Sequence, residues 1–205
     1  MDRITDEDNL WLNAVKMEDQ GNFFEASVYY LKDASGCLKQ NTLVKTALSC
    51  SCAASCLANL GNPIAARQLY LEAARIYEEN ADSIIGESIR ESLWSLQEAY
   101  EYYLLGGYDD KAQKVYDKSL FLARKVNPFS GEDEIMRNLR MKKKQADDTM
   151  NVTRTNAQIS AEIDEEIQRF MLQRKSNPNT DKGTDHTVLL KSTKGGKTSE
   201  ESIAS

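Results

Sequence analysis

The sequence is poor in the residues that interrupt regular structure. Its 205 residues include only 10 glycines and 3 prolines. An all-β protein needs a turn every eight to twelve residues or so, and turns depend heavily on these two residue types. The shortage therefore argues against an all-β fold and favours long helices. Apolar residues make up 40% of the chain, which is enough for a substantial core.

Catalytic chemistry also lacks the residues it needs. The only histidine in the sequence is His186, in a segment without helical periodicity. A Ser–His or Cys–His pair would have to draw its base from that segment, and no glycine-rich phosphate loop is present. We therefore predict a protein that is not an enzyme, needs no cofactor and has no small-molecule substrate.

Long apolar runs are missing as well. No run approaches the roughly 18 residues of a membrane span, and the acidic first twenty residues lack the apolar core of a signal peptide. Both absences predict a cytoplasmic protein.

Charge is unevenly distributed along the sequence. Residues 1–128 carry 13 basic against 19 acidic side chains, whereas residues 129–205 carry 13 of each. The acidic first part disfavours nucleic acid as its main partner.

Three segments of the chain repeat one pattern. GNFFEASVYYLKDA begins at Gly21, GNPIAARQLYLEAA at Gly61, and the more divergent GYDDKAQKVYDKSLFLA at Gly107. Each has an alanine five residues after the glycine and a tyrosine nine residues after it. Glycine commonly ends a helix, and in GNP the asparagine and proline suit the start of the next one. Each segment therefore predicts the turn and second helix of a helix hairpin.

The offsets of 40 and 46 residues between the segments indicate an internal repeat. An amphipathic hairpin cannot bury its apolar face alone, so about three units must stack to share a core. We predict an all-α fold, a right-handed stack of about three helix hairpins over residues 1–128. A helical extension over 129–175 and a disordered tail over 176–205 follow. Apolar residues from Ile85 to Tyr103, spaced by three or four, predict one helix that begins near Asp82.

The repeated positions resemble those of the tetratricopeptide repeat family. The shared features are a small residue in the first helix, the turn glycine, the alanine and the aromatic residue, here Ala14, Ala54, Gly21, Gly61, Gly107, Ala26, Ala66, Ala112, Tyr30, Tyr70 and Tyr116. Family units are usually about 34 residues long. The longer units of this chain are more similar to the long-helix variant in SNAP-type trafficking adaptors. The resemblance covers roughly residues 5–126 and implies an α-solenoid with a groove lined by the first helix of each hairpin.

The groove that the resemblance implies contains two tryptophans. Tryptophan is enriched at binding hot spots, although both side chains could instead cover the core. The expected groove has no Lys or Arg, which favours a neutral, basic or apolar partner segment. The predicted groove residues are Trp11, Val15, Glu18, Asp19, Ser51, Ser55, Asn59, Trp94, Gln97 and Glu101.

The helical extension begins with a basic cluster. It either contacts an anionic surface, such as a membrane, a nucleic acid or an acidic protein, or forms a solvated helix face. The basic cluster consists of Arg137, Arg140, Lys142, Lys143 and Lys144.

An apolar stripe of helical period follows the basic cluster. It either folds back to cap the last hairpin or pairs with another chain as a short coiled coil. The stripe consists of Ile159, Ile163, Ile167, Phe170 and Met171.

Four cysteines, Cys37, Cys50, Cys52 and Cys56, are present, and three of them fall in the run CSCAASC. On a helix, Cys52 and Cys56 share a face, but Cys50 points about 200° away from Cys52. No histidine is nearby to complete a tetrahedral zinc site, so small buried packing residues are favoured and no metal is expected. A redox or metal-regulated role for Cys52 and Cys56 remains the alternative.

Together these features favour a non-catalytic scaffold or adaptor that binds a partner peptide or helix in the groove. One alternative is an adaptor that contacts a membrane or nucleic acid through the basic cluster. The cysteine-based regulatory protein is the other. The sequence leaves the oligomeric state open.

Overall fold

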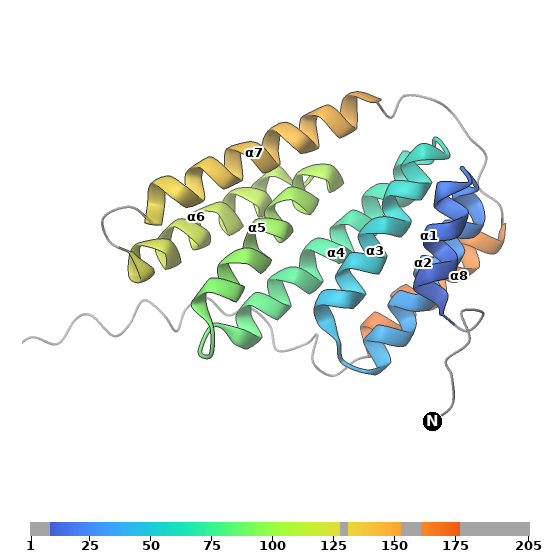
Figure 1. Ribbon diagram of the computed structural model, residues 1–205, viewed down its shortest axis with the longest axis horizontal. Helices are drawn as coiled ribbons and strands as arrows, with labels where there is room; N and C mark the ends of the chain where they lie inside the picture. Colours follow the sequence, from blue (N-terminus) through green and yellow to red (C-terminus); the bar gives the residue numbers. More distant parts are fainter. Residues whose placement is uncertain (1–8, 128–130, 153–160, 177–205) are drawn as a thin grey trace, which may run out of the picture.

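The computed structural model describes residues 9–127, 131–152 and 161–176. Over these residues the chain is all-α, as predicted, and contains no strand (Figure 1). The helices are α1 (Leu10–Asp19), α2 (Phe23–Lys39), α3 (Leu43–Asn59), α4 (Pro63–Ile84), α5 (Ile89–Gly106), α6 (Asp109–Val126), α7 (Gly131–Val152) and α8 (Ala161–Ser176). Ile159 and the predicted tail from residue 177 onward lie outside the described residues.

The GNP segment ends one helix and starts the next, as predicted. Gly61 has a φ of 73°, a left-handed conformation that glycine adopts without a steric penalty. The side chain of Asn62 accepts a hydrogen bond of 3.3 Å from the backbone N–H of Ala65. Pro63 is the first residue of α4. The connection between α3 and α4 is therefore very short, and the two helices lie side by side.

From α1 to α6, each helix packs against the next one in the chain. The repeated alanines and tyrosines take part in this packing. Ala26, Ala66 and Ala112 are almost completely buried, which is consistent with close approach of neighbouring helices. Tyr30 and Tyr70 are buried as well. Tyr116, the third repeated tyrosine, is half-buried, so the repeated alanines and the first two tyrosines are core residues.

The single helix predicted from Asp82 is instead divided between α4 and α5. The chain turns between Ile84 and Ile89, and the side chain of Ser88 caps α5 by accepting a hydrogen bond of 3.3 Å from Glu91 N. Ile85 and Ile89 are both half-buried on either side of this turn. The helical spacing of apolar residues therefore continues across the turn, so the sequence pattern does not reveal that α4 ends and α5 begins there.

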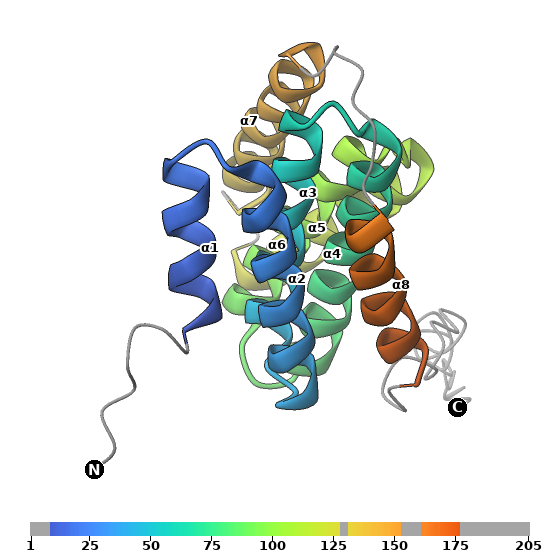
Figure 2. The same ribbon diagram turned by 90° about the vertical axis from the view of Figure 1, so that its right-hand side faces the viewer.

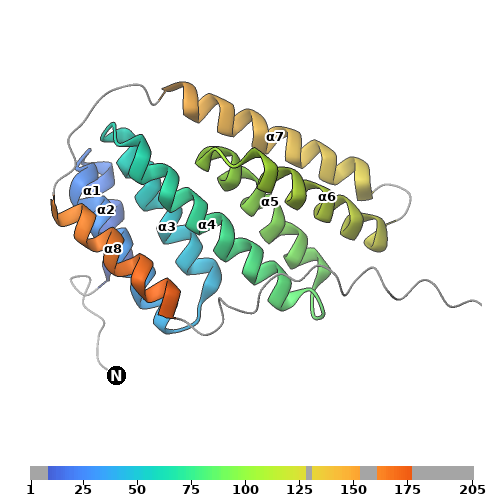
Figure 3. The ribbon, with the colours of Figure 1, turned by 180° about the vertical axis from the view of Figure 1, so that it is seen from behind.

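The last two helices pack at different places. α7 packs against α5 and α6, whereas α8 returns to α2, near the start of the chain. Figure 2 shows α1 and α8 on opposite sides of α2, and Figure 3 shows α8 from behind, beside α2 and α4. Ile163, Ile167 and Phe170 are buried. The apolar stripe therefore does not cap the last hairpin, because α8 covers the first one.

Candidate protein-binding cleft

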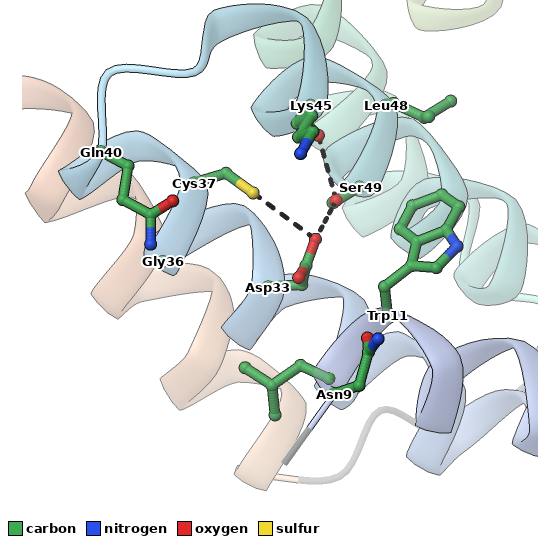
Figure 4. Close-up of a pocket in the computed structure, with 10 residues that line it drawn as sticks. Asn9, Trp11, Asp33, Gly36, Cys37, Gln40, Lys45, Leu48 and Ser49 are labelled. Atoms are coloured by element: carbon green, nitrogen blue, oxygen red, sulfur yellow. Dashed lines mark hydrogen bonds between the residues drawn. The ribbon is translucent and has the colours of Figure 1, made fainter. Parts of the chain in front are cut away.

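A cleft of about 590 Å³ opens between α1, α2 and α3 (Figure 4). This volume lies within the range of about 300–1,000 Å³ that is usual for binding pockets. One side is formed by α2 residues that recur every three or four positions and so share one helix face. The lining residues are Asn9, Leu10 and Trp11 at the start of α1, Asp33, Gly36 and Cys37 from α2 with Gln40 directly after it, and Lys45, Leu48 and Ser49 from α3.

The apolar side chains that line the cleft are Leu10, Trp11 and Leu48. The indole of Trp11 packs edge-on against the ring of Tyr30, with the ring centroids 5.1 Å apart and the planes at 67°. The Tyr30 hydroxyl in turn donates a hydrogen bond of 2.7 Å to Glu18 Oε2. Leu48 of α3 also lines the cleft and leaves 39% of its surface exposed. The cleft therefore presents apolar surface that the core does not use, beside an aromatic ring held in place.

Asp33 supplies a carboxylate to the lining of the cleft. Ser49 Oγ, 2.6 Å away, and Cys37 Sγ, 3.7 Å away, both donate hydrogen bonds to Oδ2 of Asp33. Burial raises the pKa of the Cys37 thiol, and the charge of Asp33 raises it further, so the thiol keeps its proton and can act as the donor. Within the described ranges, no basic side chain forms an ion pair with Asp33.

Of the predicted groove residues, only Trp11 lines this cleft. Ser51 is buried and donates a hydrogen bond of 2.9 Å to the Leu48 carbonyl, while Gln97 donates one of 3.2 Å to the Leu93 carbonyl. Ser51 also interacts with the hydroxyl of Tyr102 on α5, so its side chain is used inside the protein. Asp19 and Asn59 are exposed, and the half-buried residues are Val15, Glu18, Ser55, Gln97 and Glu101.

Trp94 belongs to a separate aromatic ladder between α4 and α5. The ring of Tyr102 stacks on Tyr70 at 5.9 Å and on Tyr77 at 5.7 Å, with interplanar angles of 11° and 10°. Trp94 meets Tyr77 edge-on at 5.7 Å and is 45% exposed. The two tryptophans are therefore held by different helix pairs, Trp11 by α1 and α2 and Trp94 by α4 and α5.

One member of the basic cluster is used within the protein. Lys142 Nζ of α7 lies 2.8 Å from Glu98 Oε1 and 2.7 Å from Glu101 Oε2 of α5. Burial alone would lower the pKa of Lys142, but the hydrogen bonds to both glutamates outweigh it and raise the pKa. Glu101 thus pairs with α7. The other members, Arg137, Arg140, Lys143 and Lys144, are exposed.

All four cysteines are free thiols. Burial is the main reason that the pKa values of Cys52 and Cys56 rise to about 12. Thiol chemistry and metal ligation both use the thiolate, which such pKa values disfavour at neutral pH. The part of the chain that the structure describes contains no group of three or more His, Cys, Asp or Glu side chains arranged to hold a metal ion.

The cleft residues other than Trp11 were missed at the sequence level. Asp33, Gly36, Cys37 and Gln40 follow helical spacing, but this stripe is polar and small rather than apolar. It became recognisable only once α1 and α3 were placed on either side of it. Nothing in the sequence indicated that Leu48 is exposed and lines a cleft, because an exposed leucine cannot be told from a buried one within a helix of mostly small residues.

Comparisons of the chain with known protein families, with curated proteins and with solved structures gave no match. In the described ranges, no helix is both long enough and apolar enough to cross a membrane.

Proposed function

We propose that this protein is a tetratricopeptide-like repeat scaffold that binds a segment of a partner protein and catalyses no reaction. In this proposal, α1 to α6 form a right-handed stack of three hairpins of the long-helix type found in SNAP-type adaptors. The observation that carries the proposal is the cleft between α1, α2 and α3. It combines a tryptophan, an exposed leucine and a carboxylate on helices that are otherwise packed.

The size and chemistry of the cleft suit one or two side chains of a peptide. Aromatic anchors in concave sites dominate the binding energy of many protein interfaces. Trp11 is held by its contact with Tyr30, so its ring loses little freedom when a partner binds. In this proposal, the amide of Gln40, which also lines the cleft, bonds the backbone of an extended segment.

Panning a library of random 15-residue peptides against the full-length protein tests this proposal. We expect enriched peptides whose affinity, measured by fluorescence anisotropy, falls at least tenfold in the variants Trp11→Ala and Leu48→Ser. Leu48→Ser is the safer variant because the side chain is 39% exposed. Phe121→Ala is the matched control, since Phe121 is an exposed aromatic residue on α6, 53% exposed. The proposal would be contradicted if the affinity of the peptides were unchanged in both cleft variants, or if no peptide were enriched.

A second function is favoured by the exposure of four members of the basic cluster. Arg137, Arg140, Lys143 and Lys144 all project from α7 into solvent. If they contact an anionic membrane, the protein will bind vesicles containing phosphatidylserine, and this binding will fall steeply with salt. Changing the four residues to glutamine should abolish it, whereas the Leu48→Ser variant should bind normally. Equal binding to neutral vesicles would rule this function out.

A further inference from the structure

The cleft contains a carboxylate that any apolar occupant would have to bury. Ser49 and Cys37 both donate to Oδ2 of Asp33. In the described part of the chain, no hydrogen bond reaches Oδ1, and this atom is not among the buried side-chain atoms that lack a partner. Oδ1 is therefore accessible to solvent in the open cleft. A purely apolar side chain would shield this oxygen from water and offer no hydrogen-bond donor in exchange, at a considerable cost in free energy.

We propose that the cleft recognises a lysine or arginine side chain of the partner protein, an inference that rests on the proposed function. The cationic head pairs with Asp33 Oδ1, and the aliphatic stem packs on Trp11 and Leu48. Lysine and arginine suit this combination because their stems pack on apolar surface while their heads keep polar contacts. An ion pair in a partly desolvated site also restores what the carboxylate loses when water leaves.

The aromatic wall favours the same occupant. A cation within about 6 Å of an indole face is attracted to it, and tryptophan is the strongest of the aromatic side chains in this respect. Trp11 and Asp33 line one cleft, so a single cationic side chain has both available (Figure 4). A neutral hydrogen-bond donor would gain the contact with Asp33 but not the attraction to the ring.

Lys45 is the alternative source of positive charge. It also lines the cleft and is exposed, but it forms no ion pair with Asp33 in the structure. If Lys45 moved onto Asp33 when a partner bound, the partner would need no cation. If the partner supplies the cation, Lys45 repels it. The two arrangements predict opposite effects of removing Lys45, which makes this residue the discriminating variant.

Two peptide libraries with a fixed central residue, lysine in one and methionine in the other, test the inference on the full-length protein. We expect the lysine library to yield peptides that require Leu48. Their affinity should fall at least tenfold in Asp33→Asn, which keeps an oxygen acceptor for Ser49 and Cys37. Changing the central lysine of such a peptide to methionine should remove this sensitivity to Asp33→Asn. Lys45→Ala should leave the affinity of the lysine peptide unchanged or raise it severalfold.

Each contrary result has a separate meaning. The inference would be overturned if only the methionine library yielded peptides that require Leu48. It would also be overturned if the affinity of a lysine peptide were unchanged in Asp33→Asn. Neither result would contradict the proposed function. A loss in Lys45→Ala as large as in Asp33→Asn would overturn it by assigning the cation to Lys45. A dimer by light scattering that Leu48→Ser dissociates would place a second copy of this chain in the cleft instead. No Leu48-dependent binder from either library would overturn the proposed function as well.

Discussion

Replacing Arg174 with alanine is expected to detach α8 from α2 and α4 and to lower the free energy of unfolding by about 3–5 kcal/mol. The guanidinium of Arg174 is the cation shared by two carboxylates of α4. Its Nη2 lies 2.9 Å from Glu79 Oε2, and its Nε lies 3.8 Å from Glu72 Oε2. Arg174 is 6% exposed and Glu72 is 4% exposed, so water cannot replace the lost charge while α8 remains docked.

The size of this effect has an upper limit. Once α8 leaves, both carboxylates regain water, and Glu72 keeps its pairing with Arg75. The loss therefore cannot exceed the free energy with which α8 docks. Docking also includes the burial of Phe170 and the 2.8 Å hydrogen bond from Gln173 Nε2 to the Ser35 carbonyl. For a chain of this size, 3–5 kcal/mol corresponds to a decrease of roughly 6–20 °C in Tm.

Thermal unfolding followed by circular dichroism, together with hydrogen exchange along α8, would measure the loss. Lys175→Ala is the matched control, because it removes the same charge from the same helix. Lys175 is exposed and forms no ion pair within the described ranges, so we expect a change of no more than about 1 kcal/mol. Adding Glu79→Gln to Arg174→Met should recover part of the stability, since it removes an unpaired charge. Equal effects of Arg174→Ala and Lys175→Ala would show that the buried ion pairs do not hold α8.

The second large effect is expected for Tyr77→Ala, which should lower the free energy of unfolding by about 3–5 kcal/mol. Tyr77 is 2% exposed and touches two rings of the aromatic ladder, Tyr102 by stacking and Trp94 by its edge. Its removal leaves a cavity between α4 and α5 and also removes both aromatic contacts, which add to the cost of lost burial.

Urea unfolding, with the emission of Trp94 as a second probe, would test this expectation in a Trp11→Phe background. Tyr77→Phe keeps the ring and is the control. No hydrogen bond to the Tyr77 hydroxyl is found within the described ranges, so we expect this variant to lie within about 1 kcal/mol of the parent protein. The Trp94 emission should shift to longer wavelength in Tyr77→Ala only. Similar free energies of unfolding for Tyr77→Ala and Tyr77→Phe would show that the ring contacts of the ladder do not stabilise the fold.

Local features of the fold could be predicted from the sequence because local chemistry sets them. Glycine at a left-handed position, asparagine as a cap and proline at the first helical position together determine where α3 ends and α4 begins. The repeated alanines and tyrosines likewise indicated which side of each helix is buried. The turn at residues 85–88 was missed, because apolar residues on both sides of it kept a helical spacing.

What the sequence determined by itself is therefore the all-α class, the turns at the repeated glycines and the burial of the repeated alanines. The tertiary structure decided what those faces meet. The docking of α8 depends on contacts between residues 95 and 138 positions apart, and the cleft needs Trp11, Asp33 and Leu48 from three helices. Helical periodicity shows that a face is buried but carries no information about its partner, because any complementary apolar face gives a similar gain. Only the packed chain brings a carboxylate, an indole and an exposed leucine into one cleft.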